Sequence, residues 1–289
     1  MMVQWGLFVC LSAVCISAAA AGKVVTADSL FAPRREVGIV TSSQVDEASG
    51  LAASRRHPNV LYTHNDHGGK PDVIVLNATT GKRLATWTIR GVQNEDWEDL
   101  AMVPCPDNGW CLLIGDIGDQ GTNTIYRIKE PDVIRTETLN VDASLKYSWN
   151  EDESESLLTD PQGEMYLVTK VDAGQRPKVY NVPKIGWGSP NPVRLSNGVT
   201  LPITSVKNGP LGGDISPDGS EILVKTREAV YYWRKQDGDT YENTMRQTPQ
   251  SLPYTREPQG EAICWSPSGN GYYTLSEGLD QPLYFYARL

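Results

Sequence analysis

The sequence predicts a single all-β domain, a β-propeller most consistent with five four-stranded blades, preceded by a short N-terminal leader. Three observations support this prediction. Short apolar runs separated by Gly, Pro, Asn and Asp fill the 289-residue chain, and no long window shows the period of a helix. One strand–turn–strand pattern occurs five times along the chain. The copies follow one another at intervals close to the length of a propeller blade.

Each copy begins with a strand that carries a Leu or Ile in its interior, and these anchors are Leu51, Leu100, Leu157, Ile215 and Ile263. A tight turn follows, as at residues 106–109 and 217–219, and then a second strand and a third strand with alternating hydrophobicity. The anchors are 49, 57, 58 and 48 residues apart. A four-stranded blade takes about 40–50 residues, so each copy is predicted to form one blade.

The two ends of the chain together supply the missing part of the last blade. From Ile263 to the end there are 26 residues, and from Gly22 to Leu51 there are 29, which together make about one more repeat. Residues 36–40 are therefore predicted to form the outer strand of the last blade and to close the ring, which removes an exposed sheet edge. Six blades are the alternative, with a further anchor in 129–148 or 184–210.

The first 21 residues predict a secretory signal peptide. They contain no charged side chain, form one apolar stretch and end in four alanines, which predicts cleavage near Ala21 and a mature domain over 22–289. An uncleaved anchor is the alternative for this segment. No later stretch is long enough to span a bilayer, so we expect a secreted, extracellular and monomeric protein without a membrane span.

The cysteines agree with an oxidising compartment. Cys105 and Cys111 flank a Pro-Asp-Asn-Gly turn and are predicted to form a disulfide across this hairpin, whereas Cys264 is predicted to be a buried thiol. Asn77 begins an Asn-Ala-Thr sequon and is a candidate glycosylation site.

The charge balance excludes one class of partner. The chain has 26 Lys and Arg against 35 Asp and Glu, a formal net charge of −9. Nucleic-acid binding requires clustered basic side chains that neutralise phosphates, so we expect no nucleic-acid partner. An acidic surface suits a soluble extracellular protein or one that binds cations.

Carboxylates are predicted to gather at one mouth of the central channel. In a propeller, the loops that lead into the innermost strands and those that leave the second strands line the same mouth. The residues predicted to surround a metal there are Glu98, Glu155, Asp214 and Glu261, with Asp116 from a neighbouring loop. So many carboxylates require protons or a cation, and oxygen ligands favour Ca²⁺, with Mg²⁺ or Mn²⁺ next. The alternative is that these side chains cap turns and are solvated.

A second group of side chains at this mouth is predicted to bind a ligand, namely His64, Asp66, Lys170, Lys225 and Arg227. The basic members suit an anionic group. The alternative for them is charge balance within an acidic mouth. No GxSxG, phosphate-binding loop or HExxH motif is present, so no catalytic residue is predicted.

Four stretches carry a resemblance to a known family: residues 47–66 (EASGLAASRRHPNVLYTHND), 96–101 (DWEDLA), 115–119 (GDIGD) and 215–219 (ISPDG). They are similar to a family of secreted, largely uncharacterised β-propeller proteins that are loosely compared with the propeller phytases. The resemblance covers nearly the whole mature chain and implies a propeller fold and secretion. It supplies no catalytic residue, because fold analogy alone does not settle function.

Two functions are compatible with these features. The first is a secreted calcium-binding propeller that binds an extracellular ligand, a glycan or a matrix component, for example in an acidic or mineralising matrix. The second is a secreted, divalent-metal-dependent hydrolase that acts on an anionic substrate such as a phosphate ester, with a metal-activated water as nucleophile.

Overall fold

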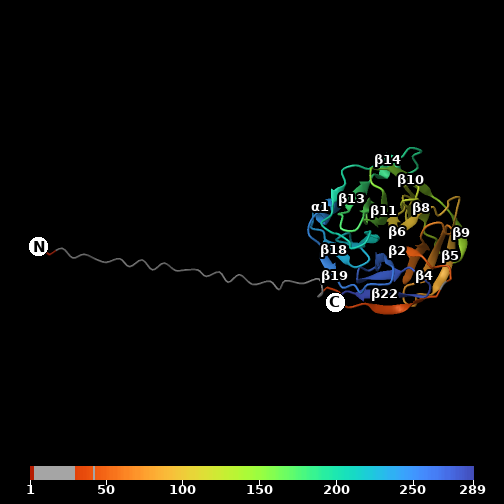
Figure 1. Cartoon of the computed structure of the whole chain (residues 1–289), viewed down its shortest axis with the longest axis horizontal. Coiled ribbons are helices and arrows are strands. Elements are labelled where there is room, and N and C mark those ends of the chain that lie inside the picture. The colour runs from red at the N-terminus through yellow and green to blue at the C-terminus, as the bar shows by residue number, and fades with distance from the viewer. Residues whose placement is uncertain (3–29, 42) are drawn as a thin grey trace.

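The computed structural model describes residues 1–2, 30–41 and 43–289, and it contains five sheets arranged around one axis (Figure 1). The predicted signal peptide, apart from its first two residues, lies outside the described residues. The innermost strands of successive blades contact one another, and that of the fifth blade contacts that of the first. The chain therefore forms a closed five-bladed propeller, as the sequence predicts.

Each blade contains four antiparallel strands in which the first is innermost. Blade 1 consists of β2 (Ala48–Ala53), β3 (Val60–Asn65), β4 (Asp72–Asn77) and β5 (Arg83–Arg90). Blade 2 consists of β6 (Trp97–Pro104), β7 (Trp110–Asp116), β8 (Thr124–Lys129) and β10 (Ala143–Ser148). Blade 3 consists of β11 (Glu153–Thr159), β12 (Met165–Lys170), β13 (Lys178–Val182) and β15 (Val199–Thr200). Blade 4 consists of β16 (Gly212–Ile215), β17 (Glu221–Lys225), β18 (Val230–Arg234) and β19 (Gln250–Leu252).

Blade 5 joins the two ends of the chain. Its inner strands are β20 (Gly260–Trp265), β21 (Gly271–Ser276) and β22 (Gln281–Ala287), and β1 (Arg35–Val40) pairs antiparallel with β22 as the outer strand. Figure 1 shows this orange N-terminal strand beside the blue C-terminal one. The predicted closure of the last blade by residues 36–40 is confirmed.

The two long stretches that could have held a sixth blade extend existing blades instead. Strand β9 (Glu137–Asn140) lies parallel to β5 as a fifth strand of blade 1, and β14 (Val193–Arg194) lies parallel to β10 as a fifth strand of blade 2. The helical elements among the described residues are short: η2 (Lys184–Gly186), a 3₁₀ turn, and α1 (Tyr241–Met245), whose first turn is capped by Thr240.

The apolar core lies between neighbouring blades. Along each inner strand successive side chains face opposite blades, because side chains in a strand alternate between its two faces. Leu113 of blade 2 thus packs with Leu167 of blade 3, and Leu61 of blade 1 packs with Leu275 of blade 5. Burial between blades therefore holds the inner strands in a fixed ring and sets the positions of their ends.

The predicted disulfide between Cys105 and Cys111 is present, with its Cα atoms 5.2 Å apart, and Cys264 is a fully buried free thiol. The bridge closes a short hairpin loop, which limits the entropy that it removes from the unfolded chain. We expect the double substitution Cys105→Ser and Cys111→Ser to lower the free energy of unfolding by about 2 kcal/mol, measured by urea denaturation. A loss below about 0.5 kcal/mol, typical of a surface substitution, would contradict this.

Candidate metal centre

A β-bulge occurs at the same place in several innermost strands. The register of the ladder shifts at Glu98 in β6, at Glu155 in β11 and at Glu261 in β20, so each glutamate is an extra residue opposite the second strand. A bulge bends the strand and re-aims the side chain that it carries. Each of these glutamates lies two residues before its anchor Leu or Ile, which explains why the repeat located them.

The other two blades depart from this pattern. Strand β2 also has a shifted register, but Ser49 stands two residues before its anchor, and its hydroxyl donates to the Glu98 carbonyl oxygen at 2.7 Å and lies 3.3 Å from Glu98 Oε2. Strand β16 pairs without a shift and has Gly213 at this position, where a Cβ atom would lie 2.8 Å from Leu223 O. The ring of glutamates is therefore interrupted at blades 1 and 4.

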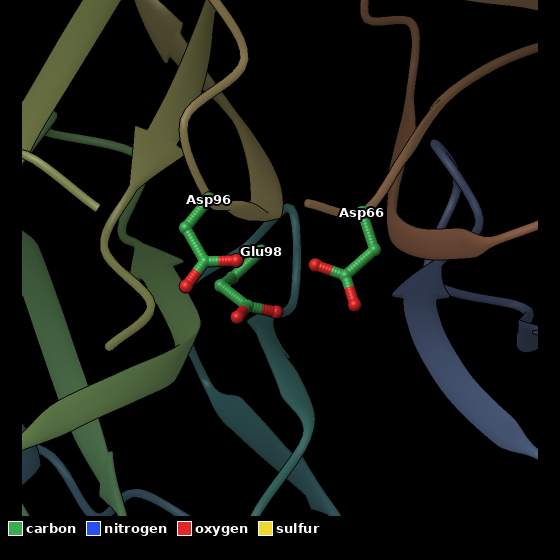
Figure 2. Close-up of side chains that lie close together, drawn as sticks. All are labelled: Asp66, Asp96 and Glu98. Carbon is green, nitrogen blue, oxygen red and sulfur yellow. The ribbon is translucent and has the colours of Figure 1, made fainter. Parts of the chain in front are cut away.

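Seven carboxylates gather at the ends of these strands, and we call them the mouth cluster: Asp66, Asp96, Glu98, Glu153, Glu155, Glu261 and Glu277. They form three overlapping groups, and within each group one carboxylate oxygen per residue lies within 4.8 Å of the others. The groups are Asp66–Asp96–Glu98, Asp66–Glu261–Glu277 and Glu98–Glu153–Glu155. Figure 2 shows the side chains of the first group: Asp96 and Glu98, from the start of β6, lie on one side, and Asp66, which follows β3, lies on the other.

Three basic side chains contact the mouth cluster. Lys170 forms ion pairs with Glu155 and, at 3.3 Å, with Glu153. Arg227 Nη2 lies 2.8 Å from Glu261 Oε1, and His67 Nδ1 lies 3.6 Å from Asp96 Oδ1. Seven carboxylates thus face only two permanent positive charges and one histidine in these contacts, which leaves an excess of negative charge.

Burial and mutual repulsion perturb the carboxyl groups. Burial, followed by the neighbouring carboxylates, raises the pKa of Glu98 and of Glu155 well above the ordinary value. Burial raises the pKa of Asp66 to about 6, and burial together with a hydrogen bond to Glu261 raises the pKa of Glu277 to about 9. Without a cation, these carboxyl groups therefore take up protons at a higher pH than ordinary carboxyl groups do.

One buried oxygen of the mouth cluster lacks a partner among the described residues. Glu155 is 5% exposed, and its Oε2 atom is buried without a hydrogen bond, although Oε1 pairs with Lys170. A buried carboxylate oxygen without a partner is costly, and the common remedies are a proton, a water or a cation. Among the described residues this oxygen is therefore an acceptor that a proton, a water or a cation could satisfy.

The loop that follows β7 shapes the cluster. Its Gln120 backbone N–H donates to Asp96 Oδ2 at 2.8 Å, and Asp116 Oδ1 accepts from the Asp96 backbone N–H at 2.9 Å. A Cβ atom at Gly118 would overlap Asp96 Oδ2 and Glu98 Oε1. Asp116 therefore supports the Asp96 backbone without joining the three groups, and Gly118 leaves the space that the two carboxylates occupy.

Asp214 lies outside the mouth cluster. It stands one residue before its anchor, as Asp99 does, and its Oδ2 accepts from the Trp265 backbone N–H of blade 5 at 2.8 Å. Asp99 likewise accepts from the Leu157 backbone N–H of blade 3 at 2.9 Å. Both aspartates link one innermost strand to the next blade, which is the role of a structural acceptor.

The predicted ligand-binding residues divide into two sets. Asp66 belongs to the mouth cluster, and Lys170 and Arg227 pair with carboxylates of that cluster. His64 and Lys225 are fully buried: burial lowers the pKa of His64 to about 4 and that of Lys225 to about 8. His64 Nε2 has no hydrogen-bond partner. These two side chains therefore lie beneath the surface that a ligand would meet.

The candidate glycosylation residue Asn77 ends strand β4 and is partly exposed. Its Oδ1 atom accepts from the backbone N–H and the hydroxyl of Thr79, at 2.9 and 2.7 Å. The sequon therefore lies in a turn at the surface.

Sequence reasoning did not select Asp96, Glu153 or Glu277 as site residues. Asp96 and Glu153 each precede a bulge glutamate by two residues, and Glu277 follows a second strand as Asp66 does. This repeated spacing was the sequence signal that could have identified these three residues. Comparison with protein-family models and with curated proteins found no match to this chain. Among the described residues, no helix is long and apolar enough to cross a bilayer.

Proposed function

We propose that this protein is a secreted, calcium-binding β-propeller whose mouth cluster holds the cation and presents it to an extracellular ligand, glycan or matrix component. The observation that carries the proposal is that the three bulge glutamates, from blades 2, 3 and 5, take part in overlapping carboxylate groups, and that one buried Glu155 oxygen has no partner among the described residues. A divalent cation would satisfy this oxygen and offset the repulsion among the carboxylates.

The donor set favours Ca²⁺. The three groups offer only carboxylate oxygens, which hard cations prefer, and they come from four different blades, which gives a broad and irregular cage. Ca²⁺ accepts six to eight oxygen ligands in flexible geometry, whereas Mg²⁺ requires a near-ideal octahedron. Mg²⁺ and Mn²⁺ are the next candidates. Glu98 and Glu155 are buried, and the partly exposed Asp66 leaves a side from which a ligand oxygen can reach the ion.

Isothermal titration calorimetry of the chelator-treated protein tests this proposal. We expect saturable binding of Ca²⁺, with weaker binding of Mg²⁺ and Mn²⁺. The variant Glu47→Gln should bind Ca²⁺ as the wild type does. Glu47 is an exposed carboxylate at the start of an innermost strand and belongs to none of the three groups. If none of the three ions binds at millimolar concentration, the proposal is wrong.

A parallel assay separates binding from hydrolysis. Phosphate and sulfate esters incubated with the calcium-loaded protein should remain intact if the mouth only binds. Calcium-dependent turnover that is lost in Glu98→Gln would support the alternative, a metal-dependent hydrolase of anionic substrates. Lys170 and Arg227 already pair with carboxylates, which favours charge balance over substrate binding for these two residues.

Gly118 provides a test of the shape of the site. Gly118→Ala should weaken Ca²⁺ binding by about tenfold, because the added methyl group would displace the Asp96 and Glu98 carboxylates. Gly69→Ala is the control, because Gly69 lies in another loop of the mouth. A Cβ atom at Gly69 would lie 3.6 Å from its nearest neighbour, which is an ordinary van der Waals distance. Equal Ca²⁺ affinities of the two variants would argue against Asp96 and Glu98 as ligands.

The raised pKa values predict the pH dependence of the cation-free protein. A carboxyl group whose pKa is higher in the folded state than in the unfolded chain stabilises the fold at low pH, and this contribution is lost as pH rises through the folded pKa. Two groups oppose this trend between pH 6.5 and 8: His64, with a pKa of about 4, is neutral in the folded protein but partly charged in the unfolded chain near pH 6.5, and Lys225, with a pKa of about 8, becomes partly neutral in the folded protein near pH 8. Glu277, with a pKa of about 9, keeps its proton in the folded protein across this window and loses it on unfolding, which outweighs the contribution of either group.

The melting temperature in EDTA should therefore fall from pH 6.5 to 8, and saturating Ca²⁺ should reduce this fall. Differential scanning fluorimetry across the window measures both slopes. A melting temperature in EDTA that rises with pH would contradict the prediction.

A further inference from the structure

A pocket of about 350 Å³ opens between blades 5 and 1, on the face opposite the mouth. Its walls include the turns that join the first strand to the second in these blades, at Asn59 and Ser268, and the turn after β4, at Thr79. These turns lie at the other end of the innermost strands from the bulges. The pocket is therefore separated from the mouth cluster by the length of the blades.

An aromatic pair forms one wall of this pocket. Tyr273 of β21 lies opposite Phe285 of β22 in the ladder, with ring centroids 4.6 Å apart and an interplanar angle of 41°. The Phe285 ring covers Gly271, where a Cβ atom would overlap it, and Tyr273 packs against the core between blades 5 and 1. The two rings are thus held in place and offer a preformed apolar surface.

Three polar groups around the pair have no side-chain partner among the described residues. Within the described part of the chain, the Arg35 guanidinium forms no ion pair, and the Tyr273 hydroxyl and the Asn59 side-chain amide form no hydrogen bond. Arg35 is close enough to Tyr273 to lower its pKa, although burial of the ring keeps that pKa raised at about 12. None of the residues that line the pocket is Asp or Glu, in a chain that has 35 of them.

We propose that this pocket binds a sugar residue that carries a carboxylate, such as a uronic acid unit of an acidic glycan. The apolar face of the sugar ring would lie on Tyr273 and Phe285. The Arg35 guanidinium would pair with the carboxylate, and the Asn59 amide and Tyr273 hydroxyl would bind ring hydroxyls. The pocket matches each part of such a sugar. Its aromatic wall suits the apolar face, its unpaired cation suits the negative charge, and its neutral hydrogen-bonding groups suit the hydroxyls. The site is independent of the proposed cation at the mouth.

The test is a titration followed by protein NMR, with protein produced without glycosylation and in EDTA, so that Asn77 carries no sugar and the mouth holds no cation. Methyl β-D-glucuronide is expected to bind with a dissociation constant of about 1 mM and to shift the resonances of Tyr273 and Phe285. Methyl β-D-glucoside should bind about tenfold more weakly, because it lacks the charge that Arg35 pairs.

Two variants test whether Arg35 is the residue that pairs with the carboxylate of the sugar. Arg35→Ala should remove the preference for the glucuronide, and the exposed position of Arg35 makes the fold insensitive to this change. Arg34→Ala is the matched control, because Arg34 lies over the Tyr284 ring and donates to Thr255 O, away from the pocket lining. The proposal is overturned if the glucuronide does not bind saturably, if Arg35→Ala leaves its preference unchanged, or if benzoate binds as tightly as the glucuronide.

Discussion

Calcium added to the chelator-treated protein is expected to raise its melting temperature by about 5–10 °C at a concentration of about 100 times the dissociation constant. The cause is linkage: a cation held by Glu98, Glu155 and their neighbours in the folded state has no comparable site in the unfolded chain. Two carboxylates about 5 Å apart repel by about 3 kcal/mol at an effective dielectric constant of 20, and the cation replaces this repulsion by attraction.

Glu98→Gln combined with Glu155→Gln should remove most of this rise. The substitutions keep the size of the side chains and remove two of the negative charges that bind the cation. In EDTA the double variant should melt at or above the temperature of the wild type, because two buried acidic groups with raised pKa values have become neutral amides. Glu47→Gln should show the full rise, and an undiminished rise in the double variant would place the cation elsewhere.

The second large effect is expected at Asp99, in the ring of innermost strands. Asp99 is 1% exposed and accepts from the backbone N–H groups of Leu100, at 2.8 Å, and of Leu157 in the next blade, at 2.9 Å. Asp99→Ala leaves both donors buried without a partner. Each such group costs about 1–3 kcal/mol, so we expect the free energy of unfolding to fall by about 3 kcal/mol.

Urea denaturation measures this difference. Asp107→Ala is the control, because the Asp107 side chain is 69% exposed and its ion pair with Lys129 lies at the surface. Its free energy of unfolding should stay within about 0.5 kcal/mol of the wild type. A loss of less than about 1 kcal/mol in Asp99→Ala would show that the blades do not depend on this link.

The contrast between Asp99 and Glu98 shows what the sequence could and could not predict. The anchor Leu and Ile residues located the five innermost strands, because burial between blades imposes a regular pattern on them. They also located Glu98, Glu155 and Glu261, which hold the same position before their anchors. Asp214 was grouped with these glutamates although it stands one residue nearer to its anchor.

In a strand a shift of one residue turns the side chain to the other face, so Asp214 has the role of Asp99. The bulges that direct the three glutamates to the mouth depend on the pairing register, which no local pattern reveals. Strands β14 and β15, with two residues each, are likewise too short for a hydrophobic period. Their places follow from the blades that they join, β15 as the fourth strand of blade 3 and β14 as a fifth strand of blade 2.

The closing of blade 5 by β1 has a consequence for the way the molecule is made and kept intact. The first strand of the described propeller must wait for the last one to be synthesised, since β1 pairs only with β22. Until then, blades 1 and 5 have no fixed relation, and Asp66 has no Glu261 or Glu277 beside it. The ring closes where the innermost strands of blades 5 and 1 come into contact, and one of the three carboxylate groups is assembled at that contact. A ring that opens between blades 5 and 1 loses that group, whereas separation of β10 from β8 at the outside of blade 2 would leave all three in place.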